Sequence, residues 1–180
     1  MMAGRMIVVA VRRSGHAVGA ITMAAGATPA VADVAGAAVP YRLAPGTPVF
    51  DVPAADLAVA EVEFDERVFQ DVKRARMLFP GGSEQSASLA FVKAGTVEVE
   101  VDPEEDTLVI KAPGSPGEDV PFWALIQPQE NGPSSVVTGE IPKGGVQSEP
   151  VAHGLTKGDT YSALVLVAGL TAHQEEITVP

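Results

Sequence analysis

Residue types that could do chemistry are few in this chain, and they are scattered. The three histidines, His16, His153 and His173, lie beside glycine or alanine. None has a second histidine or a carboxylate at the spacing of metal ligands. The absence of cysteine excludes a disulfide framework, a cysteine-based zinc site and a thiol nucleophile. We therefore expect neither a bound metal nor a cofactor.

One acidic cluster has the spacing of a calcium-binding loop. Asp102, Glu104 and Asp106 stand at positions i, i+2 and i+4, which such loops use for their first ligands. Pro103 interrupts the cluster, and the glycine and distal glutamate of a calcium loop are missing. The pattern favours a solvated hairpin turn over a calcium site.

Signatures of catalysis are also missing from the sequence. No Gly-x-Ser-x-Gly motif supplies a serine nucleophile, and residues 81–83, Gly-Gly-Ser, are too short for a phosphate-binding loop. The pairs Glu61/Glu63 and Glu98/Glu100 alternate with apolar residues, which is typical of the exposed side of a strand. We therefore expect a protein that is not an enzyme.

The only concentrated positive charge is formed by Lys73, Arg74 and Arg76, which we consider a candidate docking site. The apolar spacing predicts a helix over 65–79, capped by Asp65 and ended by Pro80. The predicted stripe on this helix contains Val68, Phe69, Val72, Arg76 and Phe79. Cations in the last turns of a helix complement its dipole, and this structural role is the more common one.

Charge divides the chain into two unequal halves. The net charge is −11, yet residues 1–83 carry 8 Lys/Arg and 8 Asp/Glu, whereas residues 84–180 carry 4 and 15. No basic face is available for nucleic acid. We interpret the acidic half as a solvated surface and the neutral half as the one that a partner covers.

The N-terminal residues resemble a secretion signal in composition. Arg12 and Arg13 precede a run rich in alanine and glycine that contains Ala30-Val31-Ala32, as in a twin-arginine signal. However, the apolar run Met6–Val11 precedes the arginines, and glycines and Pro29 interrupt the later segment. We favour a retained N-terminus. No apolar run reaches the ~18 residues of a membrane span.

The first half of the chain predicts a β-rich region with one helix. Residues 6–11 and 57–64 are expected to be strands, the second with Ala58, Ala60, Val62 and Phe64 on its buried face. Residues 17–40 are small and mostly uncharged, so we expect extended chain packed across another surface. Residues 41–52 predict a loop leading into an edge strand. We define residues 1–84 as a docking region and 85–94 as a connecting strand or linker.

Residues 95–180 predict a sandwich of seven strands. Short alternating runs recur at intervals of roughly 8–14 residues, separated by turns rich in glycine and proline. The expected strands are 96–101, 107–111, 121–128, 136–141, 146–152, 160–168 and 174–179. The predicted fold class is therefore mainly β, with a docking region followed by an immunoglobulin-like (Ig-like) sandwich.

The stretch 154–169, GLTKGDTYSALVLVAG, resembles the fibronectin type III pattern. A leucine, Leu155, precedes a turn and then Tyr161, which opens a strand of alternating aliphatic residues. Lys157 and Asp159 replace the usual proline and threonine. The resemblance implies a tyrosine corner, in which the phenol hydroxyl bonds to nearby backbone. The expected core and corner residues are Leu155, Tyr161, Val165, Val167 and Trp123, the last on the strand where Ig-type domains keep a core tryptophan.

Ig-like modules of this kind occur on bacteriophage particles, and a second resemblance points the same way. Residues 88–101, SLAFVKAGTVEVEV, are similar to a strand–Lys–small–Gly–strand stretch of lambda-type head decoration proteins. These resemblances imply a capsid decoration or minor capsid protein, or a tail component, assembled in the host cytoplasm into the virion. The implied partners are capsid proteins and further copies of the chain, without nucleic acid or membrane. A secreted adhesion or carbohydrate-binding module is the alternative.

Overall fold

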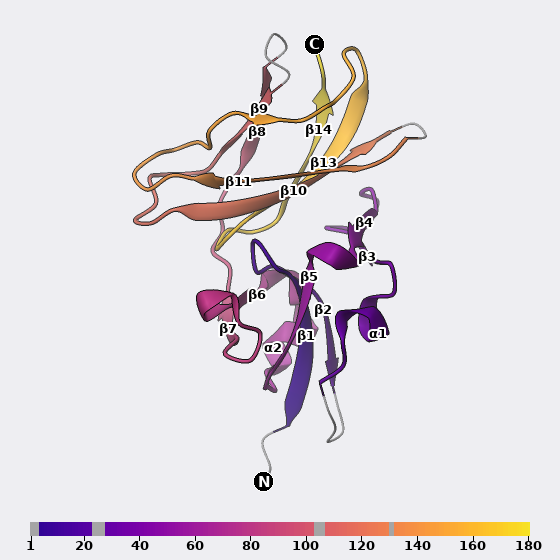
Figure 1. The fold of residues 1–180 in the computed structure, drawn as a ribbon, viewed down its shortest axis with the longest axis vertical. Helices are drawn as coiled ribbons and strands as arrows, with labels where there is room; N and C mark the ends of the chain where they lie inside the picture. Colours follow the sequence, from indigo (N-terminus) through magenta and orange to yellow (C-terminus); the bar gives the residue numbers. More distant parts are fainter. Residues whose placement is uncertain (1–3, 23–27, 103–106, 130–131) are drawn as a thin grey trace.

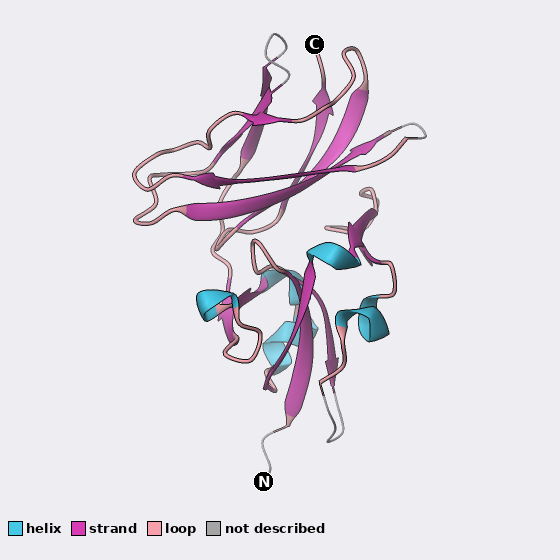
Figure 2. Cartoon of the chain, in the orientation of Figure 1, coloured by secondary structure: helices cyan, strands magenta, loops and turns pink. Residues whose placement is uncertain are grey.

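The computed structural model describes residues 4–22, 28–102, 107–129 and 132–180. It confirms a mainly β fold, and the short helical segments all lie in the first half of the chain (Figure 2). The two halves stack end to end, with the N-terminus at one end and the C-terminus at the other (Figure 1).

The first half is organised on a three-stranded antiparallel sheet in the order β2-β1-β5. Its strands are β1 (Arg5–Val11), β2 (Ala17–Thr22) and β5 (Leu57–Glu63). The central strand β1 is buried on both faces from Met6 onward, which explains its continuous apolar sequence. Both faces of this sheet therefore need a cover.

Different elements cover the two faces. Met6, Val8 and Ala10 point to the face covered by α2 (Glu66–Gln70) and by the hairpin of β6 (Ala75–Leu78) and β7 (Ser88–Phe91). Ile7 and Val9 point to the other face, where α1 (Val31–Ala35) and the hairpin of β3 (Ala38–Tyr41) and β4 (Phe50–Pro53) pack. The 3-10 turns η1 (Ala54–Asp56), η2 (Val72–Arg74) and η3 (Pro80–Gly82) connect these elements.

The second half is a sandwich of two antiparallel sheets. One sheet has the order β12-β9-β8, with β8 (Glu98–Asp102), β9 (Thr107–Lys111) and β12 (Val151–Ala152). The other has the order β11-β10-β13-β14, with β10 (Val120–Pro128), β11 (Ser135–Ile141), β13 (Thr160–Val167) and β14 (His173–Thr178). The seven strands thus form one sheet of three strands and one of four, and an Ig-like sandwich of seven strands would have this number.

The corner predicted at Tyr161 has the expected geometry. The Tyr161 hydroxyl accepts a hydrogen bond from the N–H of Thr156 at 3.0 Å. Val165 and Val167 are fully buried between the two sheets, and Leu155 packs partly buried beside them. These residues thus join the turn before β13 to the core of the sandwich.

Trp123 occupies a different place from the one its strand position predicts. It is buried, but it points away from the sandwich interior, and its neighbour Phe122 fills that interior. Trp123, Leu125, Leu164 and Leu166 form the outer face of the four-stranded sheet, which packs on the first half of the chain. Because β10 is apolar on both faces, alternation alone cannot say which face is the sandwich interior.

The helix predicted over 65–79 is wrong beyond its first turn. Asp65 caps α2 by accepting the N–H of Arg67 at 2.9 Å, but the helix ends at Gln70. The 3-10 turn η2 follows, and Arg76 lies on β6, where it pairs with Ala90 of β7. Pairing with a distant strand has overridden the local helical pattern. The helix α1 falls in a segment for which extended chain was expected.

The expected connecting segment is divided between the halves. Residues 88–91 form β7, which belongs to the first half through its pairing with β6. Lys93 then pairs with Leu170 as an isolated parallel bridge, with its N–H bonded to the carbonyl oxygen of Gly169 at 2.8 Å. The two strands within 88–101 therefore lie in different sheets. In the second half, the strand predicted over 146–152 is shortened to Val151–Ala152.

Candidate docking surface

An exposed aromatic pair lies where β5 turns into α2. Phe64 and Phe69 are 45% and 42% exposed, and their rings stack with centroids 5.6 Å apart. Phe64 was predicted to lie on the buried face of its strand, and this expectation is wrong. Large aromatic side chains that stay exposed are typical of surfaces that bind a partner.

A cation over a third aromatic ring extends this surface. The Arg67 guanidinium lies 4.3 Å from the ring centroid of Phe91, at the end of β7. The same guanidinium bonds to the Asp65 carboxylate at 2.6 Å. This contact lowers the pKa of Asp65 and raises the pKa of Arg67. Arg67 is therefore held over Phe91 by the capping residue of its own helix.

The outer edge of β5 runs beside these aromatic residues. Phe64 donates its N–H to the carbonyl oxygen of Gly4, and Arg12 donates its N–H to that of Asp56, both at 2.8 Å. Since bonded pairs alternate along an antiparallel ladder, the even-numbered residues of β5 bond to β1. The N–H and C=O groups of Val59, Glu61 and Glu63 consequently point away from β1.

Two hollows open along this edge. One, of about 520 Å³, lies between the end of β5 and β7 and includes Phe64 and Phe91 in its wall. The other, of about 390 Å³, lies farther along β5, between residues 28–29 and 84–85. Both are lined by Arg5, Glu61 and Gln85, so they meet at the middle of the strand. We refer to Val59–Phe64, Phe69 and residues 84–91 as the β5 edge surface.

The predicted basic cluster does not form one exposed patch. Lys73 donates its ammonium to the carbonyl oxygen of Leu43. Arg76 is half-buried and its guanidinium lies near Gly169 of the second half, where burial lowers its pKa. Of these three residues, only Arg74 is classed as exposed to solvent. Lys73 and Arg76 thus contact their own chain.

The histidines lie apart. His16 is buried between the halves, where its Nε2 donates to the carbonyl oxygen of Leu170 at 2.7 Å and burial lowers its pKa to about 4. His153 accepts the N–H of Leu155 at 2.8 Å, and His173 lies 3.4 Å from Glu175. Across residues 4–22, 28–102, 107–129 and 132–180, no group of three or more histidine, aspartate or glutamate side chains is arranged so that it could hold a metal ion. The predicted turn at Glu104 and Asp106 lies outside these residues.

Sequence reasoning missed the β5 edge surface because its parts are distant in sequence. Phe64 and Phe91 are brought together only by the packing of the β6–β7 hairpin on the sheet. The sequence did carry one signal, the alternation of Glu61 and Glu63 with apolar residues. In the structure Ala60 and Val62 pack toward the hairpin, so the two glutamates lie on the opposite side of β5, Glu63 exposed and Glu61 half-buried. This alternation does not show that β5 is an edge strand of its sheet.

Two comparisons, with protein-family models and with curated proteins, were made for this chain. No protein-family model matches the chain, and no curated protein matches it either. Within the part of the chain that the structure describes, no helix has the length and apolar character needed to cross a membrane.

Proposed function

We propose that this chain is a non-enzymatic structural protein of a larger assembly, which docks through residues 1–84 and presents the acidic sandwich outward. The distribution of exposed apolar side chains carries this proposal. Five of the seven large apolar side chains found exposed among the described residues belong to the first half: Ile21, Val49, Phe64, Phe69 and Leu78. Apolar exposure thus coincides with charge neutrality, whereas the net charge of −11 belongs to the other half.

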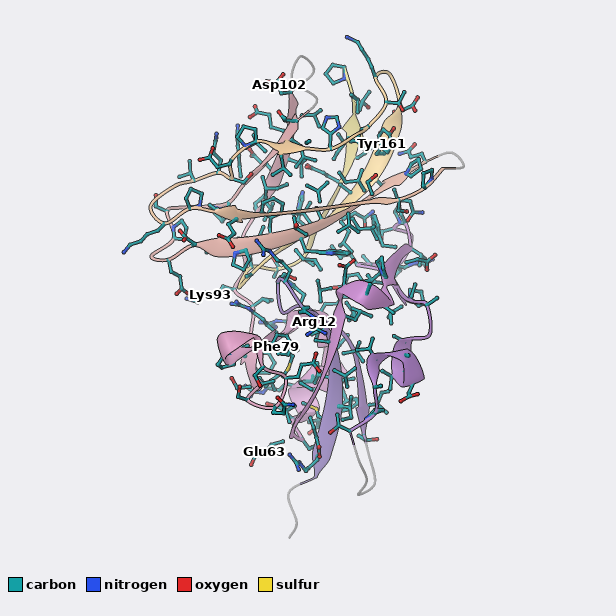
Figure 3. The ribbon with its side chains drawn as sticks, in the orientation of Figure 1. Arg12, Glu63, Phe79, Lys93, Asp102 and Tyr161 are labelled. Atoms are coloured by element: carbon teal, nitrogen blue, oxygen red, sulfur yellow. The ribbon has the colours of Figure 1, made fainter. Side chains whose placement is uncertain are left out.

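The stacking of the halves supports the same assignment. The sandwich packs on the end of the first half that holds Val9 and Leu57 (Figure 1). From there β5 runs to Glu63 at the opposite end of the first half, next to the exposed Phe64 (Figure 3). A partner bound there leaves the sandwich projecting away from the assembly. Acidic projecting modules repel one another and keep the decorated surface soluble.

The assembly that we favour is a bacteriophage particle, with the chain as a capsid decoration or minor capsid protein. This choice is supported by the resemblance of residues 88–101 to lambda-type head decoration proteins. It is also supported by the resemblance of residues 154–169 to fibronectin type III modules, since modules of this Ig-like kind occur on phage particles. The partners would then be capsid proteins and neighbouring copies of the chain. A tail protein would use the same arrangement, and its position on the particle distinguishes it.

Sedimentation with particles tests the proposal. Purified protein is mixed with phage particles from its source that lack the chain, and bound copies are counted after pelleting and located by electron microscopy. We expect saturable binding, with the first half against the particle. Absence of binding, together with absence of the chain from native particles by mass spectrometry, would contradict the proposal.

A further inference from the structure

The edge of β5 is an open template for another strand. Along Val59, Glu61 and Glu63 the outward N–H and C=O groups have no hydrogen-bond partner among the residues that the structure describes. Natural sheets usually shield such an edge with charged side chains, a proline, a bulge or a covering loop, and β5 carries two charges, Glu61 and Glu63. The register of β1 with β5 is regular over the whole strand, and β5 contains no proline. A row of unused backbone groups favours an extended ligand over a helical one.

The space beside this edge can hold a strand. The two hollows of the β5 edge surface meet at Glu61 and together follow β5 from Val59 to Phe64. Their far wall is formed by residues 84–85 and by β7. An added strand would lie about 4.8 Å from β5, at the usual distance between neighbouring strands.

The charges on β5 define one set of ligand side chains. A residue directly opposite Glu61 or Glu63 projects its side chain on the same face of the sheet as that glutamate. Glu61 already contacts Arg5 at 2.9 Å and Thr28 at 2.9 Å. Glu63 is exposed and has no ion-pair partner among the described residues, and it lies at the end of the first half far from the sandwich (Figure 3). A basic ligand residue opposite Glu63 would form an ion pair with the Glu63 carboxylate.

The other face of β5 defines the alternate side chains. A residue opposite Val62 projects into the hollow that Phe64, Leu89 and Phe91 line. Those side chains are partly exposed, so an apolar ligand side chain gains contact there. The ligand therefore alternates basic and apolar residues, complementary to the alternation of β5 itself.

A second copy of the chain is a poor ligand for this edge. Two β5 strands paired antiparallel about Glu61, Val62 or Glu63 bring glutamate opposite glutamate. Like charges that face each other across a strand pair are destabilising. The glutamates therefore disfavour self-pairing while they attract a basic strand.

We propose that the β5 edge binds an extended segment of a partner protein as an added strand, and that this segment alternates basic and apolar side chains. The inference rests on the proposed function, because it names the contact through which the first half docks. It adds the mode of binding, the edge used and the chemistry of the partner.

Peptide binding tests the mode and the chemistry. The probe is a labelled heptapeptide of alternating lysine and valine, and its binding to the full chain is measured by fluorescence anisotropy at about 0.15 M salt. One control peptide has the same composition in two blocks. The other keeps the alternating sequence but has backbone N-methyl groups that prevent ladder formation. We expect the alternating peptide to bind at least about tenfold more tightly than either control.

Three variants locate the site. Glu63→Gln removes the charge and keeps the outward N–H, so we expect affinity to fall about threefold. Glu63→Pro also removes that N–H without breaking a bond to β1, and we expect a fall of about tenfold. Glu149→Gln makes the same charge change on the exposed surface of the sandwich and should leave affinity unchanged. Unchanged thermal unfolding of each variant shows that the fold is intact.

Several results would overturn the inference. In the peptide assay, these results are no binding of the alternating peptide, or equal binding of all three peptides. In the variants, the result is an equal loss of peptide affinity in Glu63→Pro and Glu149→Gln. In sedimentation, the result is a dimer of the chain that Glu63→Pro abolishes. Particle binding is measured separately on the same variants. Particle binding that Glu63→Pro leaves intact refutes the strand-addition inference alone, whereas peptide binding without any particle binding refutes only the proposed function.

Discussion

At the scale of single residues, two buried tyrosines allow a matched test of the tyrosine corner. The Tyr161 hydroxyl accepts the N–H of Thr156, whereas the buried hydroxyl of Tyr41 has no hydrogen-bond partner among the described residues. We expect Tyr161→Phe to lower the free energy of unfolding by about 1 kcal/mol, because the Thr156 N–H loses its acceptor. Tyr41→Phe should be neutral or slightly stabilising, because it removes a buried polar atom that gains nothing. Urea unfolding of both variants checks this, and an equal effect in the two would contradict the corner.

His16 predicts a pH dependence of stability. Burial lowers its pKa from 6.5 to about 4, with the Arg76 guanidinium opposing a second positive charge nearby. Above pH 6.5 the side chain is neutral in both the folded and unfolded states. As the pH falls from 6.5 toward 4, the unfolded chain takes up a proton that the folded chain refuses. Stability therefore decreases over this range, by up to about 3 kcal/mol.

The measurement is the difference between two pH profiles. Carboxylates also titrate toward pH 4, so the free energy of unfolding is compared between the wild-type protein and His16→Asn at each pH. We expect the two curves to run parallel above pH 6.5 and to converge below it, because the variant lacks the titrating group. Curves that stay parallel down to pH 4 would show that His16 is not held neutral.

At the scale of elements, the turn between β1 and β2 depends on one glycine. Gly15 has a φ of 78°, and a Cβ atom there would lie 2.2 Å from the backbone oxygen of Met77 on β6. Gly114 has a similar φ of 77°, but a Cβ atom there would have no neighbour within 4 Å. These two positions separate the cost of backbone conformation from the cost of a clash.

Alanine at the two glycines should therefore have unequal effects. We expect Gly114→Ala to cost about 1 kcal/mol, the penalty for a left-handed conformation. Gly15→Ala should cost at least about 3 kcal/mol, because the turn must move away from β6. Thermal or urea unfolding measures both, and similar losses would mean that β6 is not packed against the turn.

The elements of the second half were the most predictable from sequence, for a physical reason. Apart from β12, its strands are at least five residues long and are separated by glycine- or proline-rich turns, so local signals agree with the final pairing. In residues 65–79 they conflict. The apolar spacing indicated a helix, but β6 forms backbone hydrogen bonds with β7, which is residues 88–91. A pairing between segments this far apart is not encoded in any local pattern. Likewise, the face chosen by Trp123 and the position of β5 at the edge of its sheet follow from tertiary packing.

At the scale of the whole molecule, the two halves share one buried core. Val9 and Leu57 of the first half pack in the same cluster as Trp123, Leu125 and Leu166 of the sandwich. Further bonds join the halves: Arg13 contacts Glu140 at 3.0 Å, and Thr171 donates its N–H to the carbonyl oxygen of Lys93 at 2.9 Å. The molecule should therefore unfold as one cooperative unit.

Trp123 reports on this junction directly, because it is the only tryptophan of the chain. We expect tryptophan fluorescence and far-ultraviolet circular dichroism to follow one coincident unfolding transition. Trp123→Ala should cost about 3–5 kcal/mol, the usual loss for a large buried aromatic side chain. A fluorescence change well before the loss of secondary structure would mean that the halves separate first.

Hydrogen–deuterium exchange of the protein bound to its particle tests the central claim most directly, because it compares both halves of the chain in one experiment. The free and the particle-bound protein are exchanged in parallel. We predict new protection over residues 57–69 and 84–91, with little change in the sandwich strands β8 and β11. Protection confined to the sandwich, with the β5 edge surface exchanging as in the free protein, would contradict docking through the first half.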